Sequence, residues 1–514
     1  MIASAKTQPR RSRLFPDMHK PKPLSFSGSA PPLNDRFLGE DENITGIGLL
    51  ENQWYIFRCN ADKAWSLATG KGVTITVIDE GFDAEHEDLK PNIDMVFNST
   101  TKNSQISTRS SGSAKHINHG TACAGLAAAV GNNNVGIAGF AFNAKLRLAQ
   151  AFKDASSADP AVPETNIRAA IGWAGLQPTS GRHVITISLG VGDTYDQIPI
   201  DAAPGSATEP ETIRMAIDAA IDNNIVVCIS AGNSSNTLGQ DLSTDQKGIL
   251  YTSSNAIVVG ATRKNQQGQD VPSNSNWGPR MTVCAPGDPA HDMTCSSKPD
   301  PYTNKFGGAS GATPKVAGTA ALMLEVNPNL TPAQVKAILN GTGRPLPNKL
   351  HDTPFGPMLD TFAAVTAAQV PASKPKLIAN RFLNFGKVDR GITPPPTQRV
   401  ALFNIGVDPL NLNSLQPKPG SSGDFKITSQ PAIPGTIPSG GSANIDIAFT
   451  PSSHKDVNAT FLLASDDPGS PHEIQCTGTA PWTFGEGFKL AGEIAAGAAA
   501  VVLVVLAITG RIKL

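Results

Sequence analysis

Three residues of different types could together hydrolyse an amide bond: Asp79, His119 and Ser310. A serine hydroxyl is a poor nucleophile at neutral pH until a general base removes its proton, and histidine suits that task. The imidazole in turn needs a carboxylate that fixes its tautomer and stabilises the imidazolium. These residue types predict acyl transfer through Ser310, with His119 as the base and Asp79 as its partner.

The sequence around each of the three residues predicts the element that positions it. Asp79 ends a β-rich apolar run, so its carboxylate should lie at the carboxyl edge of a sheet. An alanine-rich run after His119 predicts an apolar helix that begins at this histidine. Ser310 lies among glycines directly before a second apolar helix, expected over 313–326. A helix N-terminus favours a nucleophile through its dipole and its free N–H groups.

The wider pattern alternates β-rich runs with helical stretches, which predicts an α/β fold with a largely parallel sheet. The runs at 185–189, 225–229 and 257–259 are typical of buried parallel strands. Thr331 and Pro332 predict the cap and the first position of a further helix.

Four short motifs resemble those of subtilases, the subtilisin-like serine peptidases, and the resemblance covers roughly residues 51–370. They are His119-Gly120-Thr121, the Gly-Ala-Ser-Gly-Ala-Thr-Pro stretch around Ser310, Ser188-Leu189-Gly190 and Ala231-Gly232-Asn233. The resemblance implies a subtilisin-like parallel sheet with flanking helices and a serine endopeptidase activity. It also implies that Asn233 and the backbone N–H of Ser310 stabilise the oxyanion.

The chain departs from the common subtilase pattern at four positions near the catalytic residues. Ala309 and Gly311 stand where Thr and Met are common, Ala122 where a second His is common, and Lys315 where His often follows the proline. None of these changes removes a catalytic group. They bear on substrate fit more than on activity.

The resemblance also predicts how substrate is held. Ser188-Leu189-Gly190 is expected to form an edge strand that pairs with an extended peptide, and such backbone pairing is largely indifferent to side chains. Specificity must then come from pockets. Asp193 and Glu80 are acidic where kexin-like subtilases are acidic, which predicts a preference for cleavage after Lys or Arg. Asp193 as a solvated loop charge is an equally good interpretation.

A calcium site is predicted where an Asn-rich segment resembles the subtilase loop that surrounds a calcium ion. Hard cations prefer oxygen ligands from carboxylates, amides and main-chain carbonyls. The alternative is an Asn-rich turn without a metal. The candidate ligands are Gly131, Asn133, Val135 and Ile137 in the loop, with Asp88 and Gln53.

Composition limits the other function classes. The formal charge of −1 gives no reason to expect a nucleic-acid partner. The six cysteines show no metal-ligand spacing, and Cys123 is best interpreted as a small buried hydrophobe. Cys284 and Cys295 are close enough in sequence to pair, but the sequence leaves this open. Residues 1–50 lack an apolar signal sequence and predict a disordered segment, which could serve as a short pro-segment.

Composition shifts after residue 370. The stretch 371–375 is typical of a linker, and residues 376–482 predict an all-β domain with alternating apolar residues and turn signals. This domain resembles immunoglobulin-like sandwiches of the Hydin/ASPM type. A spacer role and a docking role for a protein partner both fit.

The C-terminal region predicts a transmembrane helix over 490–510. The uncharged apolar run 494–510 is near the lower limit of about 17 residues for a bilayer span. Arg511 and Lys513 favour a cytoplasmic C-terminus with the peptidase outside, whereas the missing signal sequence favours a tail-anchored protein with a cytoplasmic peptidase. The side of the membrane stays open.

The sequence therefore predicts a membrane-anchored serine endopeptidase acting on proteins or peptides, with calcium as a structural cofactor. The main alternative is a catalytically inactive subtilase fold that serves as a binding module with its sandwich. A surface adhesion scaffold is a weaker third interpretation.

Overall fold

The structure is a computed structural model of the 514-residue chain, and it describes most of the peptidase-like region and the sandwich. The described residues are 34–35, 38, 53–106, 114–151, 164–177, 179, 181–189, 209–233, 255–264, 270–273, 275–288, 292–297, 300–346, 356–370, 374–480, 482–483 and 512–513.

The first domain is built on an eight-stranded sheet with the order β2-β3-β1-β4-β5-β6-β7, and β8 pairs with β6. All strand pairs are parallel except β6 with β7. Every residue of β1 is buried, as expected for a central strand covered on both faces. The strands are β1 Val73–Asp79, β2 Ile93–Asn98, β3 Lys145–Gln150, β4 Arg182–Ile187, β5 Val226–Ser230, β6 Ile257–Lys264, β7 Asp270–Pro272 and β8 Val283–Pro286.

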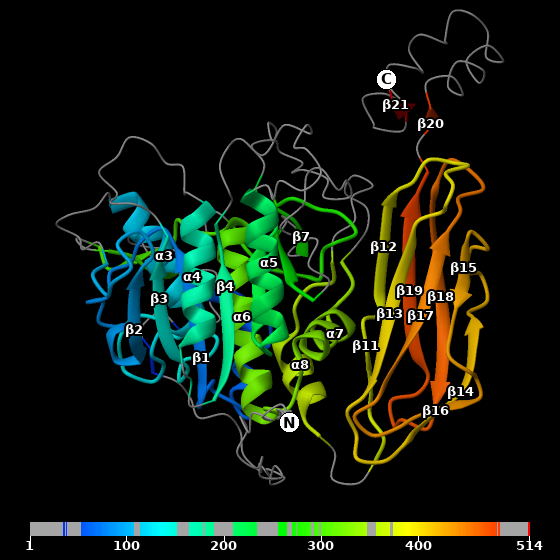
Figure 1. Cartoon of the computed structure of the whole chain (residues 1–514), viewed down its shortest axis with the longest axis horizontal. Helices are drawn as coiled ribbons and strands as arrows, with labels where there is room; N and C mark the ends of the chain where they lie inside the picture. The colour runs from blue at the N-terminus through cyan, green and yellow to red at the C-terminus, as the bar shows by residue number, and fades with distance from the viewer. Residues whose placement is uncertain are drawn as a thin grey trace, which may run out of the picture.

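Helices cover both faces of this sheet and make a three-layer α/β/α domain (Figure 1). Because neighbouring side chains of a strand point to opposite faces, Val77 packs into the core under α3 and α6, and Ile78 into the core under α4 and α5. The covering helices are α3 Ala114–Ala128, α4 Glu164–Leu176, α5 Glu209–Asp222 and α6 Gly308–Val326. The remaining elements are α1 Trp54–Arg58, α2 Ala61–Ala64, a 3-10 helix Lys90–Asn92, the strand pair β9 Thr294–Cys295 and β10 Tyr302–Thr303, α7 Pro332–Thr342 and α8 Thr361–Ala368.

The predicted helix boundaries need two corrections. α3 begins at Ala114, so His119 lies within the helix rather than at its start. α6 begins at Gly308, so Ser310 lies inside its first turn. The prediction for α7 is confirmed, since Thr331 is its N-cap and forms a capping box with Gln334.

The second domain is a two-sheet β-sandwich (Figure 1, yellow to orange). Its sheets have the orders β11-β13-β17-β15 and β12-β19-β18-β14-β16, and their inner faces share one apolar core. The strands are β11 Leu377–Ala379, β12 Phe382–Lys387, β13 Thr397–Asn404, β14 Leu410–Pro417, β15 Phe425–Ser429, β16 Gly435–Ile437, β17 Ser442–Phe449, β18 Asp456–Ser465 and β19 His472–Thr479, followed by the short pair β20 Trp482–Thr483 and β21 Ile512–Lys513.

The two domains meet through α7 and the first residues of the sandwich. Asn340 on α7 accepts hydrogen bonds from the backbone N–H groups of Arg381 (2.8 Å) and Phe382 (3.0 Å). Its Nδ2 donates to the carbonyl of Thr282 at 3.0 Å. One buried side chain thus joins the α/β domain to the start of β12.

The predicted transmembrane helix over 490–510 lies outside the described residues. In the part of the chain that the structure describes, no helix is both long enough and apolar enough to cross a membrane. The predicted disordered segment 1–50 also lies outside the described residues, except for Asn34, Asp35 and Leu38.

Candidate active site

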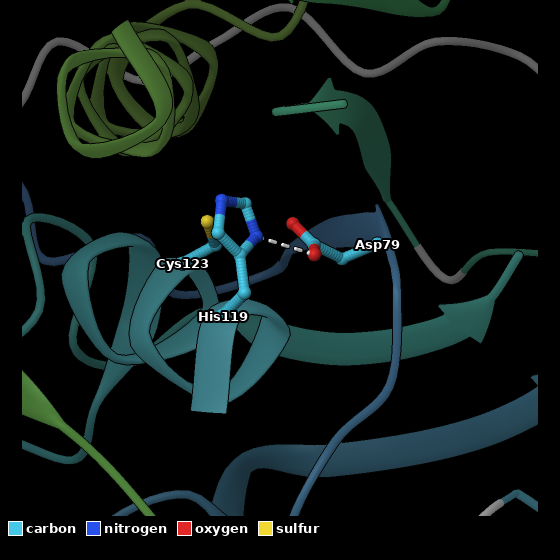
Figure 2. A group of neighbouring side chains, drawn as sticks. All are labelled: Asp79, His119 and Cys123. Carbon is cyan, nitrogen blue, oxygen red and sulfur yellow. Dashed lines mark hydrogen bonds and ion pairs between the residues drawn. The ribbon is translucent and has the colours of Figure 1, made fainter. Parts of the chain in front are cut away.

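Asp79 and His119 meet at the carboxyl edge of the sheet. Asp79 is the last residue of β1 and is fully buried. His119 Nδ1 donates to Asp79 Oδ1 at 2.7 Å (Figure 2). The Glu80 backbone N–H donates to the same oxygen at 2.7 Å. Because Nδ1 carries this proton, Nε2 of a neutral imidazole is left as the basic nitrogen. The predicted carboxylate–imidazole pair is present.

The second oxygen of Asp79 is buried and has no hydrogen-bond partner among the described residues. A buried carboxylate oxygen without a partner is costly, so the Asp79 carboxylate is favoured by the adjacent imidazole more than by its other contacts. Burial lowers the pKa of His119, but the adjacent Asp79 carboxylate outweighs it and raises this pKa well above the ordinary value. The pair thus strengthens His119 as a base.

Ser310 lies in the first turn of α6 and is oriented by Ser188. The Ser310 Oγ donates to the carbonyl of Ser188 at 3.2 Å, and the Ser188 Oγ donates back to the carbonyl of Ser310 at 3.1 Å. The Ser310 carbonyl is open to this contact because Pro314, four residues later, has no N–H to donate to it. No hydrogen bond joins Ser310 Oγ to His119 within the described part of the chain.

Asn233 lies beside the nucleophile, as the resemblance predicts. Its Oδ1 accepts a hydrogen bond from the backbone N–H of Ala309 at 2.9 Å. Because the amide oxygen is held this way, its nitrogen is the group left to donate. Gly308 has φ +65°, and a Cβ at this residue would lie 2.8 Å from Asn233 Nδ2. The glycine therefore provides both the turn into α6 and the space for the amide.

Cys123, four residues after His119 in the sequence, is buried as expected for a small hydrophobe and also borders the site. It lies one turn after His119 on α3, and its Sγ, a ring nitrogen of His119 and a carboxylate oxygen of Asp79 lie within 4.8 Å of one another (Figure 2). Asp, His and Cys are metal-ligand types, but metal binding needs a thiolate. Burial raises the pKa of Cys123 to about 12, so the thiol is protonated. The trio fits a catalytic pair packed against a buried thiol better than a metal centre.

The residues predicted to bind substrate are placed only in part. Ser188 and Leu189 directly follow β4 and are buried, and β4 lies between β1 and β5. In the structure the carbonyl of Ser188 accepts a hydrogen bond from Ser310 Oγ, and the pairing of this segment with a peptide substrate stays a prediction. Glu80 lies next to Asp79 and is half-buried. Gly190 and Asp193 lie outside the described residues.

The predicted calcium ligands lie around one buried carboxylate. Asp88 is fully buried and accepts hydrogen bonds from Asn133 Nδ2 (2.8 Å), the Ile137 N–H (2.8 Å) and the Tyr302 hydroxyl (3.3 Å). All three donors are neutral, and burial raises the pKa of Asp88 to about 7. A buried carboxylate that receives only neutral donors is the kind of group that a hard cation can neutralise.

The other members of the predicted set belong to the same loop or contact it. Gly131 and Val135 belong to the same loop, and the Val135 N–H donates to Asn133 Oδ1 at 2.9 Å. Gln53 contacts Ala138, the residue that follows Ile137. Its Oε1 accepts from the Ala138 N–H and its Nε2 donates to the Ala138 carbonyl, both at 2.8 Å.

Asp35 is a residue at this loop that the sequence prediction missed. It is buried, and it accepts hydrogen bonds from the N–H groups of Asn132 (2.9 Å) and Asn133 (3.2 Å). Asn34 similarly accepts from the Asn134 N–H at 3.1 Å. Nothing in the local sequence signals this long-range contact, apart from adjacent Asn and Asp residues that commonly accept backbone hydrogen bonds.

All six cysteines are free and buried, so Cys284 and Cys295 are not paired.

Two family descriptions match the chain. The subtilase family matches residues 70–357. The HYDIN/CFA65/VesB-like, Ig-like domain matches residues 375–479. The two matches cover the α/β domain and the sandwich described above.

Three curated relatives each match more than half of this chain. An extracellular protease from Xanthomonas campestris pv. campestris is 31% identical over 355 residues, 62% of this chain and 56% of the relative. A calcium-dependent protease from Nostoc sp. is 31% identical over 54% of this chain and 43% of the relative. Thermitase from Thermoactinomyces vulgaris is 31% identical over 52% of this chain and 80% of that protein. The chain thus spans about half the length of the first two relatives.

Proposed function

The chain belongs to the subtilase family, and we propose that it is a serine endopeptidase that hydrolyses peptide bonds in proteins. The observation that carries this proposal is the geometry at the carboxyl edge of the sheet. There a buried carboxylate bonds to an imidazole at 2.7 Å, and a serine lies in the first turn of the neighbouring helix. The extracellular protease and thermitase relatives support it.

In this mechanism Ser310 Oγ leaves the Ser188 carbonyl and transfers its proton to His119 Nε2 as it attacks the peptide carbonyl. His119 then protonates the leaving amine, and water hydrolyses the acyl-enzyme by the reverse sequence. Asp79 keeps the proton on Nδ1 throughout and stabilises the imidazolium. A catalytic hydrogen bond that is missing in the free enzyme commonly forms when substrate binds.

The negative charge that develops on the carbonyl oxygen needs donors aimed at its position. Asn233 Nδ2 and the backbone N–H of Ser310 supply them, with the Asn233 amide oriented by the Ala309 N–H. Such donors are effective because they are fixed before the reaction begins.

A fluorophosphonate probe tests the proposal directly. We expect the wild-type protein to be labelled and Ser310→Ala to be unlabelled, with an unchanged melting temperature. Ser66→Ala is the control, because Ser66 is a serine of the same domain that only donates to the Lys63 carbonyl. A well-folded wild-type protein that is not labelled would contradict the proposed peptidase activity.

One observation favours the alternative, a catalytically inactive binding module. Ser310 Oγ is hydrogen-bonded to the Ser188 carbonyl rather than to His119. If this contact is permanent, neither labelling nor peptide hydrolysis occurs. The same probe therefore decides between the two functions.

We also propose that a calcium ion is held by Asp88, Asn133, Gln53 and main-chain carbonyls of Gly131, Val135 and Ile137. The buried Asp88 carboxylate, which has only neutral donors, supports this, as does the relative named a calcium-dependent protease. The ion would neutralise Asp88 and brace the loop, with no part in bond cleavage. We expect a calcium chelator to lower the melting temperature of the wild type, and Asp88→Asn to abolish this response. Equal melting with and without chelator would contradict the site.

For specificity, we propose a preference for Lys or Arg before the scissile bond, through Glu80 and Asp193. The family description covers subtilases as a whole, so this proposal rests on the two acidic residues alone. A peptide library should show faster cleavage after Arg than after Leu, and the difference should shrink in Asp193→Asn. Equal rates of cleavage after Arg and after Leu would contradict the proposed preference.

For location, we propose that the apolar run 494–510 anchors the protein in a membrane and that the sandwich separates the peptidase from the bilayer or binds a protein partner. The uncharged run followed by Arg511 and Lys513 supports it. We expect the full chain to sediment with membranes and a chain ending at residue 483 to remain in the supernatant. Sedimentation of both, or of neither, would contradict the anchor.

A further inference from the structure

Lys315 on α6, the helix that carries Ser310, forms a fully buried ion pair with Asp292. Lys315 Nζ lies 2.6 Å from Asp292 Oδ2, and both side chains have 0% exposure. The same Nζ donates to the Pro286 carbonyl at 2.8 Å and lies 4.0 Å from the centroid of the Tyr55 ring. Burying two charges costs several kcal/mol per ion, and apolar replacements often fold as stably. Stability alone therefore gives little reason for this pair.

The segment that carries Asp292 also contacts α3, the helix of His119. Thr294 Oγ1 donates to the Ala122 carbonyl at 2.8 Å. A Cβ at Gly125 would lie 2.8 Å from Cys295 Sγ, so helix and segment are in close contact. The segment 292–295 is therefore fixed to the helix that holds the base.

The same segment contacts α6 next to the nucleophile. A Cβ at Gly311, the residue after Ser310, would lie 3.0 Å from Asp292 Oδ2. Gly311 leaves room for the Asp292 carboxylate, and Lys315 neutralises it.

We infer that Asp292 and Lys315 are a positioning pair that fixes the Ser310 end of α6 against α3 and so sets the distance from Ser310 to His119. This inference rests on the proposed peptidase activity. Ser310 Oγ must turn from the Ser188 carbonyl to His119 before it can react, and a misplacement of about 1 Å can cost on the order of a hundredfold in rate. The pair acts through α6 and does not touch substrate.

The test must separate positioning from stability. Lys315→Met leaves Asp292 as an uncompensated buried charge and should lower the melting temperature. The double variant Asp292→Leu/Lys315→Met removes both charges with side chains of similar size and should regain much of that loss. For each variant we would measure melting, kcat and KM on a peptide substrate, and the rate of fluorophosphonate labelling per mole of folded protein.

We expect the double variant to be folded, with kcat and the labelling rate lowered roughly 10- to 100-fold and KM within about twofold. Wild-type rates in the folded double variant would overturn the inference and leave the pair a purely structural feature. A wild-type protein that is not labelled at all overturns the peptidase proposal and this inference with it, so the two failures are distinguishable.

Arg147→Met is the matched control. Arg147 on β3 is another buried cation, paired with Asp94 at 2.9 Å and 4% exposed, and β3 carries none of the proposed catalytic residues. This variant should lose stability while each folded molecule is labelled at the wild-type rate. An equal loss of labelling rate in Arg147→Met would overturn a specific role for Asp292 and Lys315.

Discussion

Each domain contains a close Asp–His pair, and the two pairs serve different ends. Asp79 and His119 in the α/β domain are 2.7 Å apart, and Asp467 and His472 in the sandwich are 3.0 Å apart. Asp467 is fully satisfied, since Oδ1 accepts from His472 and the Gly469 N–H and Oδ2 accepts from the Leu377 N–H.

The Asp467–His472 pair holds a turn of the sandwich. Asp79, in contrast, has one oxygen without a hydrogen-bond partner among the described residues, and its imidazole partner lies in the same site as Ser310. An Asp–His contact is therefore not by itself a sign of catalysis. What distinguishes the catalytic pair is the unsatisfied carboxylate oxygen and the neighbouring hydroxyl on α6. Substitutions at matched residues of the two domains can test this difference.

Replacing the two aspartates should give the largest contrast. Asp79→Asn allows the wrong imidazole tautomer, so we expect kcat to fall about 10⁴-fold with little loss of stability. Asp467→Asn weakens contacts to Leu377, Gly469 and His472, so it should cost about 1–3 kcal/mol of stability while the labelling rate per folded molecule is unchanged. Peptide hydrolysis and thermal melting of both variants would measure this. Similar kinetic losses in the two variants would break the distinction.

The sequence predicted the elements that carry the candidate catalytic residues because the patterns that indicate those elements are local. Asp79 was placed by its β-rich strand and Ser310 by its glycine-rich turn into an apolar helix. The sequence failed where distant contacts decide. The polar residues before His119 hid the first turns of α3, and no local pattern could show that the Ser310 hydroxyl donates to the Ser188 carbonyl. No local pattern could show that Asp292 meets Lys315.

Two asparagines, Asn233 at the candidate active site and Asn404 in the sandwich, extend the comparison to amide groups. Asn233→Ala removes an oxyanion donor and should lower kcat about 10²- to 10³-fold with a small change in KM. Asn404, fully buried in the sandwich, donates to the Asp408 and Ile437 carbonyls at 2.8 and 3.1 Å. Asn404→Ala should therefore lower the melting temperature without changing kcat per folded molecule. A kinetic loss in Asn404→Ala would show that the sandwich contributes to catalysis.

The contact of Asn340 with the start of β12 tests whether the α/β domain works independently of the sandwich. Asn340→Ala leaves the N–H groups of Arg381 and Phe382 without their acceptor, at a cost of about 1–3 kcal/mol. We expect faster proteolysis between the domains and labelling within about twofold of the wild type. Asn329→Ala, at an exposed residue just before α7, is the control and should behave as the wild type. A large loss of labelling in Asn340→Ala would mean that the docked sandwich supports the active site.

Acid should affect the two pairs in different pH ranges. His119 must be neutral to act as a base, and its pKa is raised because the Asp79 carboxylate outweighs the opposing effect of burial. Activity should therefore rise with pH along a limb above pH 6.5, the ordinary histidine value, and Asp79→Asn should move this limb to lower pH.

The Asp467 pair should also lose its contribution in acid, but in a lower pH range and as stability rather than activity. Burial raises the pKa of Asp467, but the hydrogen bonds from His472, Leu377 and Gly469 outweigh it and leave the pKa below 3.8. A depressed carboxyl pKa contributes stability above the unfolded value, which is lost as pH falls through the folded value. The sandwich should thus weaken only below about pH 4, where the peptidase is already inactive. Melting and activity that fall together over one pH range would show that a single group controls both domains.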